Sequence, residues 1–168
     1  MPLFIDRLPF SFWVDQTRTP PTTHWAVVLP VIVRDPNLPA PPPNAPVQQW
    51  VLDTGNRSAA FAWRRHLIDA GLDPDAHLSP GGMTITSAVG GKTAVPIRLA
   101  ELWLVSNVPS TPKAVWRMQL YPGIPFHDVT TLPDPQFHRP LIGLYTLRMA
   151  GLRVEIDFAA DVVSVWTP

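Results

Sequence analysis

The stretch Asp53-Thr54-Gly55 combines a carboxylate, a hydroxyl and a glycine, residue types that could together form a chemical site. It directly follows the apolar run Trp50-Val51-Leu52, which predicts a short buried strand. One interpretation is an ordinary turn, because Asp accepts a hydrogen bond from the backbone two residues on and Gly adopts positive φ. The other is a site in which the strand holds the carboxylate rigidly and the glycine lets backbone amides approach it. The residues that follow in the chain favour the second interpretation.

Two further motifs follow in a set order. The alternating runs 83–89 and 93–99 flank Gly90-Gly91-Lys92, which indicates a β-hairpin because tight hairpin turns need positive φ. Later, Leu141-Ile142-Gly143 leads into the helix-like stretch 144–151. An apolar-apolar-Asp-Thr-Gly loop, a glycine-tipped hairpin and an apolar-apolar-Gly signature before a helix resemble the retropepsins, the single-domain retroviral type of aspartic protease. In that family a short strand and a helix also follow the Asp loop. The resemblance covers residues from about 25 to 166.

The resemblance implies an aspartic endopeptidase, an enzyme that hydrolyses peptide bonds in an extended polypeptide. In such a site two carboxylates share one proton; one activates water as a general base and the other polarises the scissile carbonyl. Asp53 would be the catalytic carboxylate, Thr54 would brace the loop through its hydroxyl, and Gly55 would let the backbone approach the carboxylates. The substrate-binding positions implied are Asn56 and the flap residues Val89, Gly90 and Gly91.

The two carboxylates have to come from two chains. The sequence contains one apolar-apolar-Asp-Thr-Gly, and no other carboxylate lies in a comparable strand-end context. We therefore expect a homodimer with a two-fold axis through the Asp53 loops, and the resemblance implies that Gly143 packs against the same loop. The chain-terminal hairpin, residues 152–166, offers strand edges for a sheet shared between two copies, and residues 10–14 are a further candidate strand for it.

One residue departs from the family pattern. The family usually has Ala or Ser after Asp-Thr-Gly, whereas Asn56 is larger and polar, and could crowd the substrate or supply an unusual hydrogen bond. The alternative function is therefore a catalytically silent retropepsin-like module that dimerises or binds an extended peptide by strand addition under the flap.

Composition excludes several other classes of protein. A chain of 168 residues suits one domain, here 1–168 with its core at about 25–166. Lys plus Arg and Asp plus Glu both number 13, so no basic excess exists for nucleic acid. The absence of cysteine, zinc-ligand spacing and a phosphate-binding loop predicts no metal and no cofactor. We find no export signal and no run near the ~20 apolar residues of a membrane span, and expect a soluble cytoplasmic protein without a membrane partner.

The elements needed to position Asp53 are mostly strands. The 22 prolines disfavour a helical bundle and favour a loop-rich β fold. Residues 10–14 and 25–33 predict two antiparallel strands, with Pro30 at a bulge or an edge position because it cannot donate to a ladder. The proline-rich residues 35–46 predict a semi-rigid surface loop. This loop leads the chain to the strand that carries Asp53.

After the Asp53 loop, residues 62–70 predict an amphipathic helix that ends at Gly71. Residues 79–82 read as a turn. The apolar positions change parity before residue 102, which predicts a bulge near Ala100-Glu101.

The remaining segments complete the predicted fold. Residues 106–139 predict surface loop around His127-Asp128, with one more strand over 115–120. Strict alternation over 152–158 predicts a half-buried strand, followed by a turn and a second strand over 162–166. We expect an all-β domain with one or two short helices, resembling a retropepsin protomer and closed by a flap hairpin.

Overall fold

The structure is a computed structural model, and it describes residues 4–9, 11–15, 19–36, 38–39, 42, 44–55, 60–86, 92–105, 115–119, 124–125 and 139–166. More than half of the described residues lie in strands, and two short helices accompany them, so the prediction of a mainly β protein is confirmed. The strands are β1 (Phe4–Pro9), β2 (Ser11–Asp15), β3 (Thr22–Ala26), β4 (Val28–Arg34), β5 (Gln48–Asp53), β6 (Ala60–Phe61), β7 (Leu78–Thr86), β8 (Lys92–Arg98), β9 (Glu101–Val105), β10 (Val115–Gln119), β11 (Ile124–Pro125), β12 (Leu141–Gly143), β13 (Arg153–Asp157) and β14 (Val162–Trp166). The helices are α1 (Arg64–Asp69) and α2 (Leu144–Met149).

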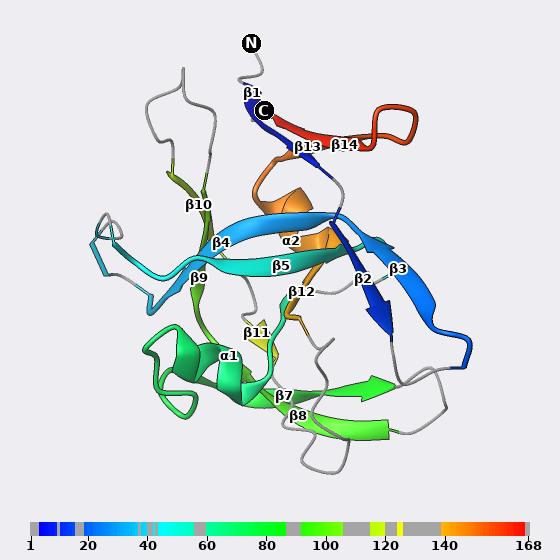
Figure 1. Cartoon of the computed structure of the whole chain (residues 1–168). Coiled ribbons are helices and arrows are strands. Elements are labelled where there is room, and N and C mark those ends of the chain that lie inside the picture. Colours follow the sequence, from blue (N-terminus) through cyan, green and yellow to red (C-terminus); the bar gives the residue numbers. More distant parts are fainter. Residues whose placement is uncertain are drawn as a thin grey trace.

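The strands form four sheets. The largest is a six-stranded sheet in the order β10-β9-β4-β5-β12-β6, and a three-stranded sheet of β1, β14 and β13 joins the first and last strands of the chain. A second three-stranded sheet contains β11, β8 and β7, and β2 pairs with β3 alone. In Figure 1, β4 and β5 cross the middle of the molecule, with the β1-β14-β13 sheet above them and the β7–β8 hairpin below. The six-stranded sheet therefore lies between the β1-β14-β13 sheet and the β7–β8 hairpin.

A cluster of buried apolar side chains lies against this central sheet. Trp50 is fully buried, as the apolar run before Asp53 predicted, and its indole nitrogen donates to Gln48 Oε1 at 3.2 Å. Helix α1 contributes the buried Leu67, and β14 contributes Val163 and Val165. Because β14 supplies core residues, the chain-terminal sheet is part of the packing that supports the strand of Asp53.

The predicted antiparallel pair near the N-terminus forms, but its second strand is divided. β2 pairs with β3, and the chain then continues past Val27 into β4, which belongs to the six-stranded sheet. Pairs between β4 and β5 run from Val28 to Val31, whereas pairs between β4 and β9 begin only at Val31. Among the described residues Pro30 pairs with β5 alone, so this position of an internal strand lacks a ladder partner on its other side, in keeping with the predicted bulge or edge position.

The helix after the Asp53 loop is shorter than the predicted stretch 62–70. It starts at Arg64, and Trp63 is its N-cap with extended backbone. Gly71 adopts φ +75° just beyond the helix, and its amide donates to Ile68 O at 2.8 Å, as a glycine at the predicted C-terminal position should. The buried face is narrow, because Leu67 is its one fully buried residue while Ile68 is exposed.

Two predicted irregularities differ from the structure. Residues 79–82 lie within β7 rather than in a turn, because the register of β7 against β8 shifts between Leu78 and Gly82 and absorbs the extra residues as a bulge. The change of parity near Ala100, where a bulge was predicted, has a different cause. There the chain leaves β8 in one sheet and enters β9 in another, so each strand has its own inward face.

Gly82 makes a close contact that gives a testable prediction. A Cβ atom at this position would lie 2.7 Å from the carbonyl oxygen of Val95 on β8, and backbone cannot swing aside as a side chain can. Gly82 is itself exposed, but the added methyl group would have to displace backbone, and we expect Gly82→Ala to destabilise the protein by about 1–3 kcal/mol, the cost typical of an inserted group that shifts backbone. Chemical denaturation would measure it, and Thr84→Ala, at an exposed position of the same strand, is the control. Equal stability of the two variants would contradict the close approach.

The chain-terminal hairpin forms as predicted, with β13 and β14 antiparallel. Phe158 does not continue the inward face and is 77% exposed. The strand ends at Asp157, whose Oδ1 accepts hydrogen bonds from the amides of Ala159 and Ala160 at 2.9 and 3.0 Å and so turns the chain.

On the side away from β13, β14 pairs with β1, a strand that the sequence analysis did not predict. Residues 10–14, the predicted candidate for this sheet, lie instead largely in β2, which pairs with β3 in a separate ribbon. Neither helix in the described residues is long and apolar enough to cross a membrane.

Candidate functional site

Asp53 lies at the end of an internal strand. The amide of Leu52 donates to Val27 O at 2.8 Å, and on the other side the amide of Val51 donates to Pro140 O at 2.8 Å. Hydrogen bonds on both sides fix the last residues of β5, so the carboxylate leaves the sheet from a rigid position.

The strand beside it is β12, and the two run parallel. Leu141, Ile142 and Gly143 are in register with Val51, Leu52 and Asp53, in that order. Gly143 is buried and is also the N-cap of α2, so the chain turns into a helix at the level of Asp53. The two motifs that carry the family resemblance, about ninety residues apart in sequence, thus end side by side.

A third strand completes this arrangement. β6, formed by Ala60 and Phe61, pairs antiparallel with β12 on the side away from β5. The chain that leaves the Asp53 loop therefore returns to the far side of β12 before it enters α1. The resemblance implied a short strand between the Asp53 loop and the helix, and β6 lies at that place, although a strand of two residues shows no periodicity of its own.

The loop itself closes on the carboxylate. The amide of Gly55 donates to Asp53 Oδ1 at 3.0 Å, and a Cβ atom at Gly55 would lie 3.3 Å from the same oxygen. This close approach of a backbone amide is what both interpretations of Asp-Thr-Gly predict, so it does not choose between them. Asp53 is half-buried, whereas Thr54, the predicted brace, and Gly55 are exposed.

The other predicted site residues fall outside the described residues. These are Asn56 and the hairpin-tip residues Val89, Gly90 and Gly91. The two arms of the hairpin are described as far as the pair Thr86 and Lys92, so the predicted hairpin is confirmed without its tip. The residues His127-Asp128 also lie outside the described part.

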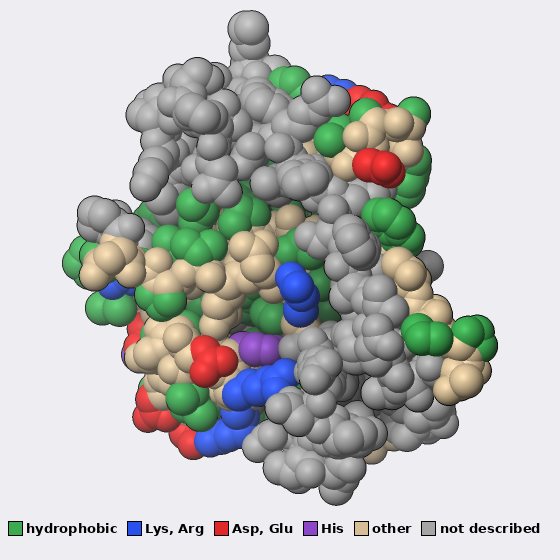
Figure 2. Space-filling model, in the orientation of Figure 1, with side chains coloured by type: hydrophobic (Ala, Val, Ile, Leu, Met, Phe, Trp, Pro, Cys, Tyr) green, Lys and Arg blue, Asp and Glu red, His purple; other side chains and the backbone are tan. Residues whose placement is uncertain are grey.

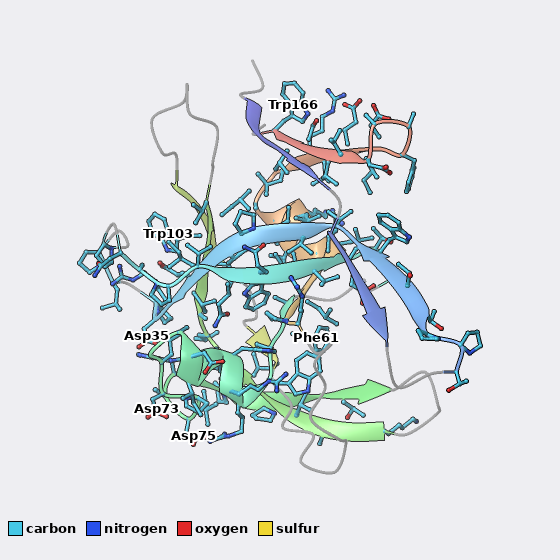
Figure 3. The ribbon with its side chains drawn as sticks, viewed as in Figure 1. Asp35, Phe61, Asp73, Asp75, Trp103 and Trp166 are labelled. Carbon is cyan, nitrogen blue, oxygen red and sulfur yellow. The ribbon has the colours of Figure 1, made fainter. Side chains whose placement is uncertain are left out.

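The aromatic side chain of Phe61 lies between the central sheet and the hairpin. Figure 3 places Phe61 of β6 between β12 and the β7–β8 pair, and β11 pairs with β8 from Ile124 to Pro125 while also contacting β6. Figure 2 shows hydrophobic side chains in the middle of this face, with basic, acidic and histidine side chains among and below them. An extended chain lying here would therefore meet both apolar and charged side chains.

A buried arginine anchors the base of the hairpin. Arg98 at the end of β8 is fully buried, and its Nε and Nη1 donate to Asp73 O at 2.8 Å and Leu99 O at 3.0 Å. Its Nη2 donates to the carboxylate of Asp35, which follows β4, and His77 Nε2 lies 4.0 Å from the other oxygen of that carboxylate. Figure 3 shows Asp35 and Asp73 beside α1. The hydrogen bonds of Arg98 therefore link the hairpin to the central sheet and to the α1–β7 connection.

The ion pair of Arg64 and Asp75 gives a second prediction. Arg64 donates to both oxygens of Asp75 at 2.7 and 2.6 Å, and these hydrogen bonds lower the pKa of the Asp75 carboxyl. Because the pKa of Asp75 is lower in the folded than in the unfolded state, the pair stabilises the fold at pH values above the unfolded pKa. This contribution is lost as the pH falls through the folded pKa. We expect Arg64→Gln to raise the pKa of Asp75 toward its ordinary value in an NMR titration. The exposed Arg148→Gln on α2 is the control, and an unchanged titration in Arg64→Gln would contradict the assignment.

The described residues contain no group of three or more His, Asp or Glu side chains placed to hold a metal ion. No protein-family model matches the chain, and comparison with curated proteins and with solved structures finds no match either.

Proposed function

We propose that the protein is a retropepsin-like aspartic endopeptidase that works as a homodimer. The observation that supports this most is the parallel pairing of β5 with β12, which brings Gly143 opposite Asp53 at the common end of the two strands. A plain turn at Asp53-Thr54-Gly55 would need no such partner. A catalytic carboxylate does need it, because its position must be held by rigid elements.

The exposure of the loop supports the second half of the proposal. Thr54 and Gly55 are exposed beside a half-buried Asp53. A second copy related by a two-fold axis would cover these residues and place its own Asp53 beside the Asp53 of the first copy. β1 and β13 are the outer strands of the β1-β14-β13 sheet in the described part of the chain, and they offer further strands for the same contact.

The proposed reaction is hydrolysis of a peptide bond by the two Asp53 carboxylates, which share one proton. The ionised carboxylate takes a proton from water, and the resulting oxygen nucleophile attacks the scissile carbonyl carbon, whose oxygen is polarised by the protonated partner. The tetrahedral intermediate then collapses, the C–N bond breaks, and a carboxyl proton passes to the leaving amine. Two carboxylates this close cannot both ionise easily, so the pair titrates as a unit.

The substrate is an extended polypeptide that lies between the central sheet and the β7–β8 hairpin. Phe61 lies at this place, and next to its aromatic ring a charged substrate side chain would be buried without a partner. Mapping cut sites in a peptide library should find apolar residues on both sides of the scissile bond. Dominant cleavage after Lys or Asp would contradict this placement.

The decisive experiment follows activity and mass together. Light scattering across a dilution series should show a dimer, and cleavage of a denatured protein, at mildly acid to neutral pH, should fall in proportion to the dimer fraction. Full activity from a species of monomer mass would exclude a shared site. A dimer that binds peptide without cutting it would instead indicate the catalytically silent module. Truncation after Ala159 would not test the dimer cleanly, since it removes the buried Val163 and Val165 from the core.

A further inference from the structure

Two large apolar side chains are exposed beside the Asp53 loop. Trp25 of β3 is 63% exposed, and Leu144, the first residue of α2, is 40% exposed. The loop residues Thr54 and Gly55 are exposed as well. None of these residues belongs to the buried core. Exposed apolar side chains that gather at one place are typical of a surface that contacts another molecule.

The sheet topology places Trp25 and Leu144 on opposite sides of this loop. β4, β5 and β12 are neighbours in this order, and neighbouring strands are about 4.8 Å apart, so the strand of Asp53 lies between two strands that are about 10 Å apart. Leu144 directly follows β12, whose last residue is in register with Asp53. Trp25 precedes Val27 by two residues, and Val27 O accepts the hydrogen bond from the amide of Leu52. Both exposed side chains therefore flank the end of β5 from which the loop emerges.

Trp25 lies on a ribbon of two strands. β2 and β3 pair only with each other among the described strands, and Figure 1 shows their ribbon projecting from the central sheet at the end where β4 begins. A two-stranded ribbon is at best marginally stable in water unless another surface packs against it. A molecule that covers the exposed Trp25 would supply such a surface.

The backbone segments around these side chains are uncharged. Residues 25–28, 54–55 and 141–147 include no Asp, Glu, Lys, Arg or His. A contact across a two-fold axis brings the same surface of both copies together, so charged side chains here would meet like charges. The cores of protein interfaces are depleted of charged residues and enriched in aromatic ones such as Trp. This surface therefore suits a second copy of the chain better than a charged partner.

We propose that Trp25 and Leu144 form the apolar part of the interface between two copies of this chain, on both sides of the paired Asp53 loops. The sequence has a single apolar-apolar-Asp-Thr-Gly, so a second carboxylate has to come from a second copy at this loop. A copy placed there would cover the exposed side chains beside the loop. The inference rests on the homodimer of the proposed function and not on its chemistry, because a catalytically silent dimer would use the same surface.

The test is the dimer dissociation constant of the full chain, measured by analytical ultracentrifugation over a dilution series. Trp25→Gln and Leu144→Gln should each raise this constant at least about tenfold, because a two-fold axis makes every contact twice and a few large side chains dominate most interfaces. The control is Ile68→Gln, which changes an aliphatic side chain on α1 that is 59% exposed and should leave the constant unchanged. Cleavage by the two interface variants should return at concentrations that restore the dimer.

Methyl NMR of the unaltered chain locates the contact without a substitution. The methyl signals of Leu144 should change between the dilute monomer and the concentrated dimer, whereas those of Ile68 should not. Unchanged dissociation constants in both interface variants, or Leu144 signals that do not respond to dimer formation, would overturn this inference and leave the proposed function standing. A dimer that depends on Trp25 and Leu144 but cleaves no peptide would support the inference and overturn the proposed protease. A chain that stays a monomer at every concentration would overturn both.

Discussion

Asp53→Asn is expected to abolish peptide cleavage and leave the fold intact. Asparagine retains a carbonyl oxygen that can accept the hydrogen bond that Gly55 now donates to Asp53 Oδ1 at 3.0 Å, so the loop keeps its closure. It has no ionisable group, so water loses its general base, a role worth about 10²–10⁴-fold in rate by itself. In a homodimer both carboxylates disappear at once, and we expect the loss to reach or exceed the upper figure.

The measurement is cleavage of an apolar peptide by the purified protein, alongside thermal unfolding. The matched control is Asp69→Asn, which makes the same change at an exposed position on α1. We expect the control to cleave normally and the Asp53→Asn protein to unfold at the same or a higher temperature, since like-charge repulsion in the dimer is relieved. Peptidase activity retained in Asp53→Asn would refute the aspartic mechanism.

The largest effect on stability is expected from Asp35→Ala. Asp35 accepts a hydrogen bond from the fully buried Arg98, and its removal leaves that guanidinium with two backbone carbonyls but no counter-charge. Breaking a buried pair on one side typically costs about 3–5 kcal/mol, and the partial exposure of Asp35 favours the lower figure. Urea unfolding would measure the loss.

Two further variants test whether the burial of Arg98 causes the large loss of stability expected for Asp35→Ala. Glu155→Ala breaks the exposed pair with Arg153, whose atoms are 3.1 Å apart, and should cost less than about 1 kcal/mol. The double variant Asp35→Ala with Arg98→Met removes the stranded charge and should recover part of the loss. Equal costs for the two ion pairs would show that the burial of Arg98 does not matter.

The parts of the fold that sequence predicted are those with a local cause. The buried strand before Asp53, the hairpin arms around Lys92 and the terminal hairpin each have a periodic apolar pattern or turn chemistry within a few residues. Gly71 likewise marks the end of α1 by its positive φ. The residues Asp53 and Gly143 were singled out by a resemblance, and the register of β5 and β12 then placed them side by side.

The parts that were missed depend on partners far away in the chain. β1 forms because it pairs with β14, about 150 residues later in the chain. The resemblance implied a short strand where β6 lies, but its antiparallel pairing with β12 was not predicted. The division of residues 25–33 at Val27 depends on which sheet accepts each half. No pattern within a short window carries this information, since non-local pairing decides it.

The staggered pairing of β4 divides the central sheet into two units. Val31 is paired with both β5 and β9, whereas residues before it pair with β5 and residues after it pair with β9. Pro30, which has no amide hydrogen, stands directly before this junction and cannot donate to a β9 ladder there. The backbone hydrogen bonds of β9 and β10 can therefore break without breaking one of β5, β12 or β6, although Leu102 and Leu104 of β9 belong to the same buried core. Amide exchange should accordingly show two protection classes in one sheet, with the strand of Asp53 in the slower class.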